Sequence, residues 1–201
     1  SVRGHNRSSF ERYEYPADLP AEVIADMSEI AARVAERTGL DDTPFNIEFF
    51  HDARRDRLWL LELNVRISKS HSPIFEKVTG VPHNEVMLDV ALGRRPDYPP
   101  AAGRFRVAAK FMPRVYGDHD DAVVTRVPPP DELDALEARF PGTDIQMHLE
   151  EGQRLGDIRH RDSYSYELAT IFMGANSRAE LLENYRRCRA ALDLRIEGVT
   201  S

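Results

Sequence analysis

The chain has 201 residues, of which 41% are apolar and 30% are charged, and its formal net charge is −7. These proportions indicate a folded protein, and the absence of a ~20-residue apolar run, of a signal-peptide core and of a Lys/Arg block argues against membrane insertion, secretion and nucleic-acid binding. Cys188 is the only cysteine, which excludes an internal disulfide and a cysteine-rich metal site, so we expect a cytoplasmic protein.

The first predicted elements are a helix and two strands. A helix is expected over 20–38, since apolar residues recur at helical spacing and Gly39 follows as a natural stop. Two strands are expected at 45–50 and 58–66, joined by the polar segment 51–57. In both runs the odd positions are mostly apolar and the even positions mostly polar, which predicts strands with one buried face.

The next segment contains two short predicted helices and a candidate boundary. Ser72-Pro73 is a good N-cap and N1 pair for a helix that runs to about Thr79, and a second helix is expected to end at Gly93. The stretch 94–103 contains three prolines, so we expect one lobe over residues 1–98 and a smaller lobe over 99–201.

The remaining elements alternate between strands and helices. Strands are predicted near 104–115, 121–127, 144–150 and 164–173, a short helix near 131–139, and a last helix that opens with Ser177 and Glu180 as a capping box. This order predicts an α+β fold with mainly antiparallel pairing and flanking helices.

One constellation of polar residues points to chemistry. If the runs at 45–50 and 58–66 pair as a hairpin centred on Arg55, Glu48 lies directly opposite Glu62, and Asn46 lies opposite Asn64. Both pairs then point away from the apolar face. Two opposed carboxylates repel each other, so the pairing is unfavourable in isolation.

A divalent cation between the two carboxylates would reverse the sign of this interaction. Magnesium prefers carboxylate and amide oxygens, and Asn64 supplies a neutral oxygen on the same face as Glu62. Arg66 adds a positive charge that can hold a phosphate bidentately. The alternative is two ordinary glutamates on a solvated sheet face, and a one-residue change of register would move every side chain to the other face.

The motifs around these residues resemble the closing strands of the ATP-grasp superfamily. FNIEF at 45–49 and LELNVR at 61–66 follow the usual order of its motifs, with Val65 where proline is usual. RISKSHS at 66–72 and EKVTGVP at 76–82 are similar to the following segment of carbamoyl-phosphate synthetases and biotin-carboxylase-like enzymes. Past residue 98 the likeness is looser, at 151–158 and 162–169.

The resemblance implies roles for individual residues. It implies that Glu48, Glu62 and Asn64 bind Mg²⁺, with Mn²⁺ as the other candidate ion, between the phosphates of ATP. It implies that Arg66 contacts the transferred phosphate as the catalytic residue, and that Asn64, Arg66 and Lys69 contact the nucleotide.

The loop that follows is expected to face the substrate. The residues assigned to this role are Ser68, Ser70 and His71, and the alternative for His71 is a simple loop or capping role.

The resemblance also implies an activity. ATP-grasp ligases phosphorylate a carboxylate to an acyl phosphate, which an amine or another nucleophile then displaces. Small-molecule carboxylate and nucleophile substrates and an upstream nucleotide-binding lobe are therefore expected partners, and a homodimer is a further expectation. We expect the chain to be the C-terminal portion of a longer enzyme and to be inactive alone.

Two other functions compete with the ligase. One is a non-catalytic binding or scaffold module derived from an ATP-grasp lobe. The other is a component of a biotin-dependent carboxylase, although no biotin-attachment AMKM motif is present. Two further motifs are interpreted as structural: 160–162 lacks the companion motifs of a kinase catalytic loop, and the acidic run 118–121 follows a turn sequence.

Overall fold

A computed structural model describes residues 1–5, 9–98 and 101–199, apart from the side chain of Lys69. Among these residues no helix is long and apolar enough to cross a membrane. The fold is α+β, as predicted, and all of the named strand pairs are antiparallel.

The largest described sheet has five strands in the order β1-β2-β5-β10-β8. It combines strands from both sides of the proline-rich segment 94–103, so strands of the two predicted lobes share one sheet. The division of the chain at residue 98 stays a prediction. The strands are β1 (Val2–Arg3), β2 (Phe10–Tyr15), β5 (Val107–Phe111), β8 (Thr143–Met147) and β10 (Ala169–Ala175).

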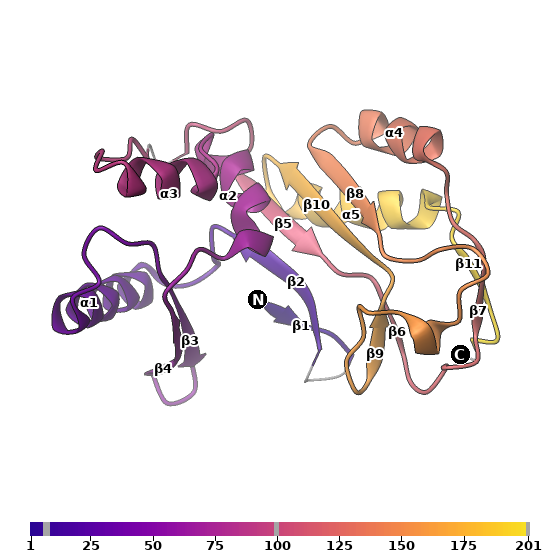
Figure 1. Cartoon of the computed structure of the whole chain (residues 1–201), viewed down its shortest axis with the longest axis horizontal. Helices are drawn as coiled ribbons and strands as arrows, with labels where there is room; N and C mark the ends of the chain where they lie inside the picture. The colour runs from indigo at the N-terminus through magenta and orange to yellow at the C-terminus, as the bar shows by residue number, and fades with distance from the viewer. Residues whose placement is uncertain (6–8, 99–100, 200–201) are drawn as a thin grey trace.

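Helices cover both faces of this sheet (Figure 1). On one face the core contains Phe111, Ile171 and Leu181, the last from the C-terminal helix. On the other face Ile74 and Val78 pack on Ala108 and Phe172. The helices are α1 (Ala21–Thr38), α2 (Ser72–Thr79), α3 (His83–Ala91), α4 (Pro130–Arg139) and α5 (Arg178–Ala191).

Three two-stranded sheets complete the fold. The β3–β4 hairpin lies with α1 at one end of the molecule, and β7 and β11 lie at the other end (Figure 1). A third core, around Val124, Leu155 and Leu168, supports the latter end. The strands are β3 (Asn46–Asp52), β4 (Arg57–Asn64), β6 (Arg114–Tyr116), β7 (Val123–Arg126), β9 (Ser165–Glu167) and β11 (Arg195–Glu197).

Local signals in the sequence set several helix ends. Gly39 adopts a left-handed φ of 67° at the end of α1, and its N–H donates to the Ala35 carbonyl. The Ser177 side chain accepts a hydrogen bond from the Glu180 N–H, as the predicted capping box requires. The predicted cap at Ser72 is wrong: Ser72 is already helical, and its hydroxyl accepts from the N–H of His83, which ties α2 to α3.

The hairpin departs from the predicted burial. Its apolar odd positions were expected to face a core, yet the exposed fractions are 51% for Trp59, 62% for Leu61 and 58% for Val65. A β-bulge between Glu48 and Phe49 shifts the register, so that Phe49 pairs with Leu60. Strand alternation alone therefore overestimates burial, because no described element packs closely over this part of the hairpin.

Candidate functional site

The hairpin places two carboxylates face to face. Glu48 pairs with Glu62 and Asn46 with Asn64, which confirms the predicted register on this side of the bulge. Both glutamates are exposed, and neither makes a hydrogen bond or ion pair with any described residue. Two like charges directly opposite each other destabilise a sheet unless a cation lies between them.

A series of hydrogen bonds between two side-chain amides and a guanidinium lies beside this pair. Asn46 Nδ2 donates to the Arg66 carbonyl at 2.8 Å, and Asn64 Nδ2 donates to Asn46 Oδ1 at 3.4 Å. The Arg66 guanidinium turns back toward Asn64 Oδ1, at 3.4 Å. These hard oxygen donors beside two free carboxylates are the donor set that Mg²⁺ prefers, so the residues fit such an ion.

The loop after β4 turns into the hollow beside the hairpin. Ser68 Oγ lies 2.7 Å from His71 Nδ1. Burial, followed by the positive charge of Lys110, lowers the pKa of His71 to about 4, so the imidazole is neutral at pH 7. Ser70 is exposed, and the Lys69 side chain lies outside the described part of the chain.

A cavity of about 660 Å³ lies next to the carboxylate pair. Asn46 and Glu48 form part of its wall, and Ser68 and His71 form another part. The structure therefore brings four of the sequence-selected polar residues to one cavity. Glu62, Asn64, Arg66 and Ser70 are not among its lining residues.

Tyr13 on β2 was not selected from the sequence. Its ring lies 4.4 Å from the His71 ring, centroid to centroid, and it lines the cavity. Burial, and next the charge of Glu48, raise the pKa of the Tyr13 hydroxyl. Through Tyr13 the main sheet contributes to the same cavity as the hairpin. The alternation of aromatic and charged residues in FERYEY at 10–15 is the only local signal that could have marked this strand.

A second polar cluster lies on β9 and the segments beside it. Arg114 donates to Glu167 Oε2 at 2.7 Å, and His148 Nε2 lies 3.4 Å from Glu167 Oε1. The His160 ring stacks on the His148 ring at 3.9 Å. Among the described residues, the one group with three metal-ligating side chains close together is His148, His160 and Glu167. Because the Arg114 guanidinium is already bound to the Glu167 carboxylate, its positive charge disfavours a metal ion at the same carboxylate.

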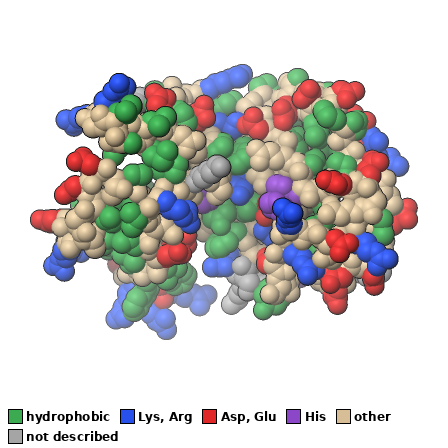
Figure 2. Space-filling view, in the orientation of Figure 1, with side chains coloured by type: hydrophobic (Ala, Val, Ile, Leu, Met, Phe, Trp, Pro, Cys, Tyr) green, Lys and Arg blue, Asp and Glu red, His purple; other side chains and the backbone are tan. Residues whose placement is uncertain are grey.

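The space-filling view gives the setting of these groups. Basic and histidine side chains gather near the middle of the drawn face, beside a hollow between the two ends of the molecule (Figure 2).

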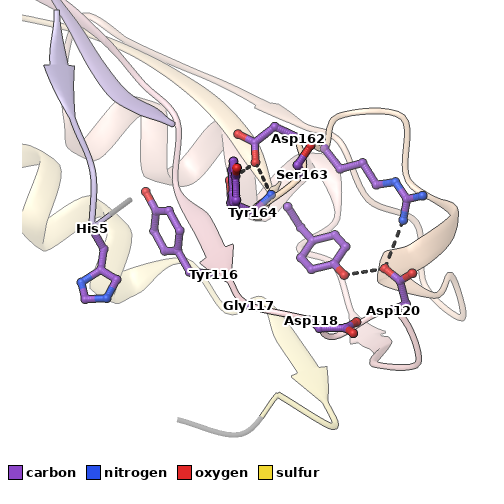
Figure 3. A pocket seen from close by; sticks show the side chains of 11 residues that line it. His5, Tyr116, Gly117, Asp118, Asp120, Asp162, Ser163 and Tyr164 are labelled. Carbon is purple, nitrogen blue, oxygen red and sulfur yellow. Dashed lines mark hydrogen bonds and ion pairs between the residues drawn. The ribbon is translucent and has the colours of Figure 1, made fainter. Parts of the chain in front are cut away.

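The acidic motifs that the sequence interpretation treated as structural line another cavity, of about 940 Å³ (Figure 3). Asp120 accepts from the Tyr166 hydroxyl at 2.5 Å and from Arg161 at 3.1 Å. Asp162 accepts from Ser9 Oγ and from the N–H of Tyr164, both at 2.8 Å. These two carboxylates are therefore engaged in holding loops together, which agrees with a structural role.

Comparisons with known proteins show a similarity over part of the chain. Residues 13–97 match the model of the family described as "Carbamoyl-phosphate synthase L chain, ATP binding domain". The chain is 32% identical over 121 residues to the carbamoyl phosphate synthase large chain of Clavibacter sepedonicus, a match that covers 60% of this chain and 10% of that protein. The chain thus spans about a tenth of the length of this relative.

Solved structures share the fold over nearly the whole chain. An L-amino acid ligase from Bacillus licheniformis superposes with a TM-score of 0.66 at 18% identity, covering 93% of this chain and 44% of that one. The biotin carboxylase domain of the Hydrogenobacter thermophilus 2-oxoglutarate carboxylase, a dimer solved with MgADP and bicarbonate, superposes with a TM-score of 0.62 at 18% identity, covering 96% and 40%. Residues 13–97 are therefore similar to the ATP-binding domain of the carbamoyl-phosphate synthase large chain, and the chain shares the fold of biotin carboxylase and L-amino acid ligase structures.

Proposed function

We propose that this chain supplies the magnesium- and phosphate-binding part of the active site of an ATP-dependent ligase that activates a carboxylate as an acyl phosphate. We call the magnesium-binding residues Glu48, Glu62 and Asn64 the magnesium floor. The observation that carries the proposal is the facing pair Glu48 and Glu62, neither of which has a hydrogen-bond or ion-pair partner among the described residues, with Asn64 next on the same strand face. In a metal-free protein this arrangement is unfavourable, whereas a hard cation explains every member of it. Mg²⁺ held there would neutralise charge on the phosphates of ATP.

The residues of the chain then have defined roles. Glu48, Glu62 and Asn64 hold the cation. Arg66, released from its weak contact with Asn64, directs its guanidinium to the transferred phosphoryl group as the catalytic residue. The neutral, half-buried His71 and its partner Ser68 form the wall on the substrate side. Lys69 in the same turn is a further phosphate contact.

The proposed reaction has two steps. A carboxylate oxygen of the substrate attacks the γ-phosphorus, the bond to the β,γ-bridging oxygen breaks, and ADP leaves. The nucleophile, an amine in a carbon–nitrogen ligase, then attacks the acyl carbon and expels inorganic phosphate while its proton passes to solvent. The chain spans about a tenth of its carbamoyl phosphate synthase relative, and an upstream lobe would cover the nucleotide, so we expect the isolated chain to bind Mg-ATP weakly without turnover.

Calorimetric titration with Mg-ATP tests the proposal on this chain. The Glu62→Gln variant should weaken binding at least about tenfold, because a neutral amide binds the cation less strongly than a carboxylate. Glu36→Gln, on the exposed side of α1, is the matched control and should leave binding unchanged. Equal affinities for the wild type and Glu62→Gln would contradict the proposal and favour a non-catalytic module.

A further inference from the structure

The cavity beside the carboxylate pair has an aromatic wall. Phe75 on α2 stacks on His83 on α3, with ring centroids 4.1 Å apart and an angle of 19° between the rings. The Phe75 ring also contacts Tyr15, at 4.6 Å, and His83 Nε2 lies 3.2 Å from the Tyr98 hydroxyl. The Tyr13–His71 pair extends the series toward β2. Several aromatic rings from four separate segments thus form one side of the cavity.

This wall carries no charge at neutral pH. Burial lowers the pKa of both His71 and His83, so both imidazoles are neutral there. The neighbouring lining residues from α3, Val86 and Val90, are apolar. A ligand that lies against this wall gains from apolar and ring contacts, while an ion placed there would lose hydration without a compensating partner.

The lining from the hairpin is mixed. Asn46 and Glu48 line the cavity beside Phe45, Ile47 and Phe49, and Glu48 belongs to the proposed magnesium floor. Tyr13 and Glu48 line the same cavity. One ligand could therefore contact the floor with a charged group and the aromatic wall with an apolar one.

The volume of the cavity limits the class of ligand. Cavities of roughly 300–1,000 Å³ hold whole organic ligands, and this one has about 660 Å³. Bicarbonate would fill a small part of this space and would leave the aromatic wall unused.

We propose that the cavity binds a carboxylic acid with a bulky apolar or aromatic tail, the carboxylate toward Glu48 and Asn46 and the tail against Phe75, His83 and Val86. This assignment rests on the proposed function, because it treats the acid as the group that is phosphorylated. A substrate of this size distinguishes the chain from a domain that activates bicarbonate. It also makes α3 the element that selects the substrate.

The test uses 4-phenylbutyrate as the probe, with acetate as the tail-free acid and 4-phenylbutyramide as the uncharged analogue. Saturation-transfer NMR on this chain with Mg²⁺ should detect saturable binding of 4-phenylbutyrate, weaker binding of the amide, and none of acetate at equal concentration. Binding of acetate that equals that of 4-phenylbutyrate would overturn the proposal.

Substitutions on α3 locate the tail. Val86→Trp fills the cavity and should weaken 4-phenylbutyrate binding about tenfold or more, whereas Leu88→Trp, at a position that is 57% exposed on the same helix, should not. A thermal unfolding temperature of Val86→Trp close to that of the wild type shows that a loss of binding is not a folding defect. Unchanged binding in a folded Val86→Trp would overturn the proposal.

The two proposals fail in different ways. If 4-phenylbutyrate binds as expected while Glu62→Gln leaves Mg-ATP affinity unchanged, the cavity assignment stands and the proposed ligase function falls. If Mg-ATP binding depends on Glu62 while 4-phenylbutyrate does not bind, the substrate class is wrong and the magnesium floor stands.

Discussion

Glu48 and Glu62 lie directly opposite each other on the β3–β4 hairpin, and no described residue neutralises either carboxylate. The repulsion between the two carboxylates is present in the native state and is lost on unfolding. The pair is therefore both the strongest mark of function in the chain and a local cost in stability.

The first prediction concerns stability without divalent cations. In EDTA, Glu62→Gln should raise the free energy of unfolding by roughly 0.2–1 kcal/mol, because it removes the repulsion with Glu48. In millimolar Mg²⁺ the wild type should gain stability and the variant should gain less. Urea unfolding in the two buffers measures both effects. A variant that is destabilised in EDTA would mean that Glu62 has a stabilising partner.

The second prediction concerns Arg114, which donates to the Phe10 carbonyl, to Glu167 and to Ser165. Arg114→Met should destabilise the fold by about 3–5 kcal/mol, because Glu167, with 12% of its side chain exposed, loses its ion-pair partner. Arg186→Ala breaks the exposed pair with Glu183 and should cost under about 1 kcal/mol. Urea unfolding measures the stability of both variants. Equal losses of stability would show that Arg114 contributes no more than a surface arginine.

The third prediction concerns pH. The pKa of His71 is about 4 in the folded protein and near 6.5 when unfolded, so the unfolded state binds a proton first as pH falls. The stability associated with the neutral imidazole is complete above pH 6.5 and is lost progressively between pH 6.5 and 4. His71→Gln should flatten this part of the stability curve, while the lowered pKa of His83 leaves a residual slope. Parallel curves for variant and wild type would contradict the assignment.

The fourth prediction concerns Gly103, whose N–H donates to the Val78 carbonyl at 2.8 Å and so holds the end of α2. A Cβ at this position would lie 2.5 Å from the Lys77 carbonyl oxygen, so Gly103→Ala should destabilise by about 1–3 kcal/mol or more. Gly152→Ala is the control: it has φ +82° with no atom within 4 Å of a Cβ, and should cost only about 1 kcal/mol of backbone strain. Thermal unfolding that ranks the two the other way would refute this role for the close contact.

Local chemistry in the sequence was enough to specify much of the candidate site. The turn at 53–56 and strand alternation predict that Glu48 lies opposite Glu62, because side-chain parity and hairpin register depend on neighbours in the chain. The ends of α1 and α5 were predictable for the same reason, since Gly39 and Ser177 act on backbone groups a few residues away.

The surroundings of that site depend on how distant elements pack together. The bulge beside Glu48, the exposure of Leu61 and the position of Tyr13 depend on which elements pack against the hairpin, and alternation within a strand carries no such information. The bond between Arg114 and Glu167 joins residues 53 positions apart, and the cavity wall combines rings from β2, α2, α3 and the segment after α3. The carboxylate pair is specified by local sequence, because both glutamates lie on adjacent strands of one hairpin. The cavity beside it exists only because distant segments meet in the fold.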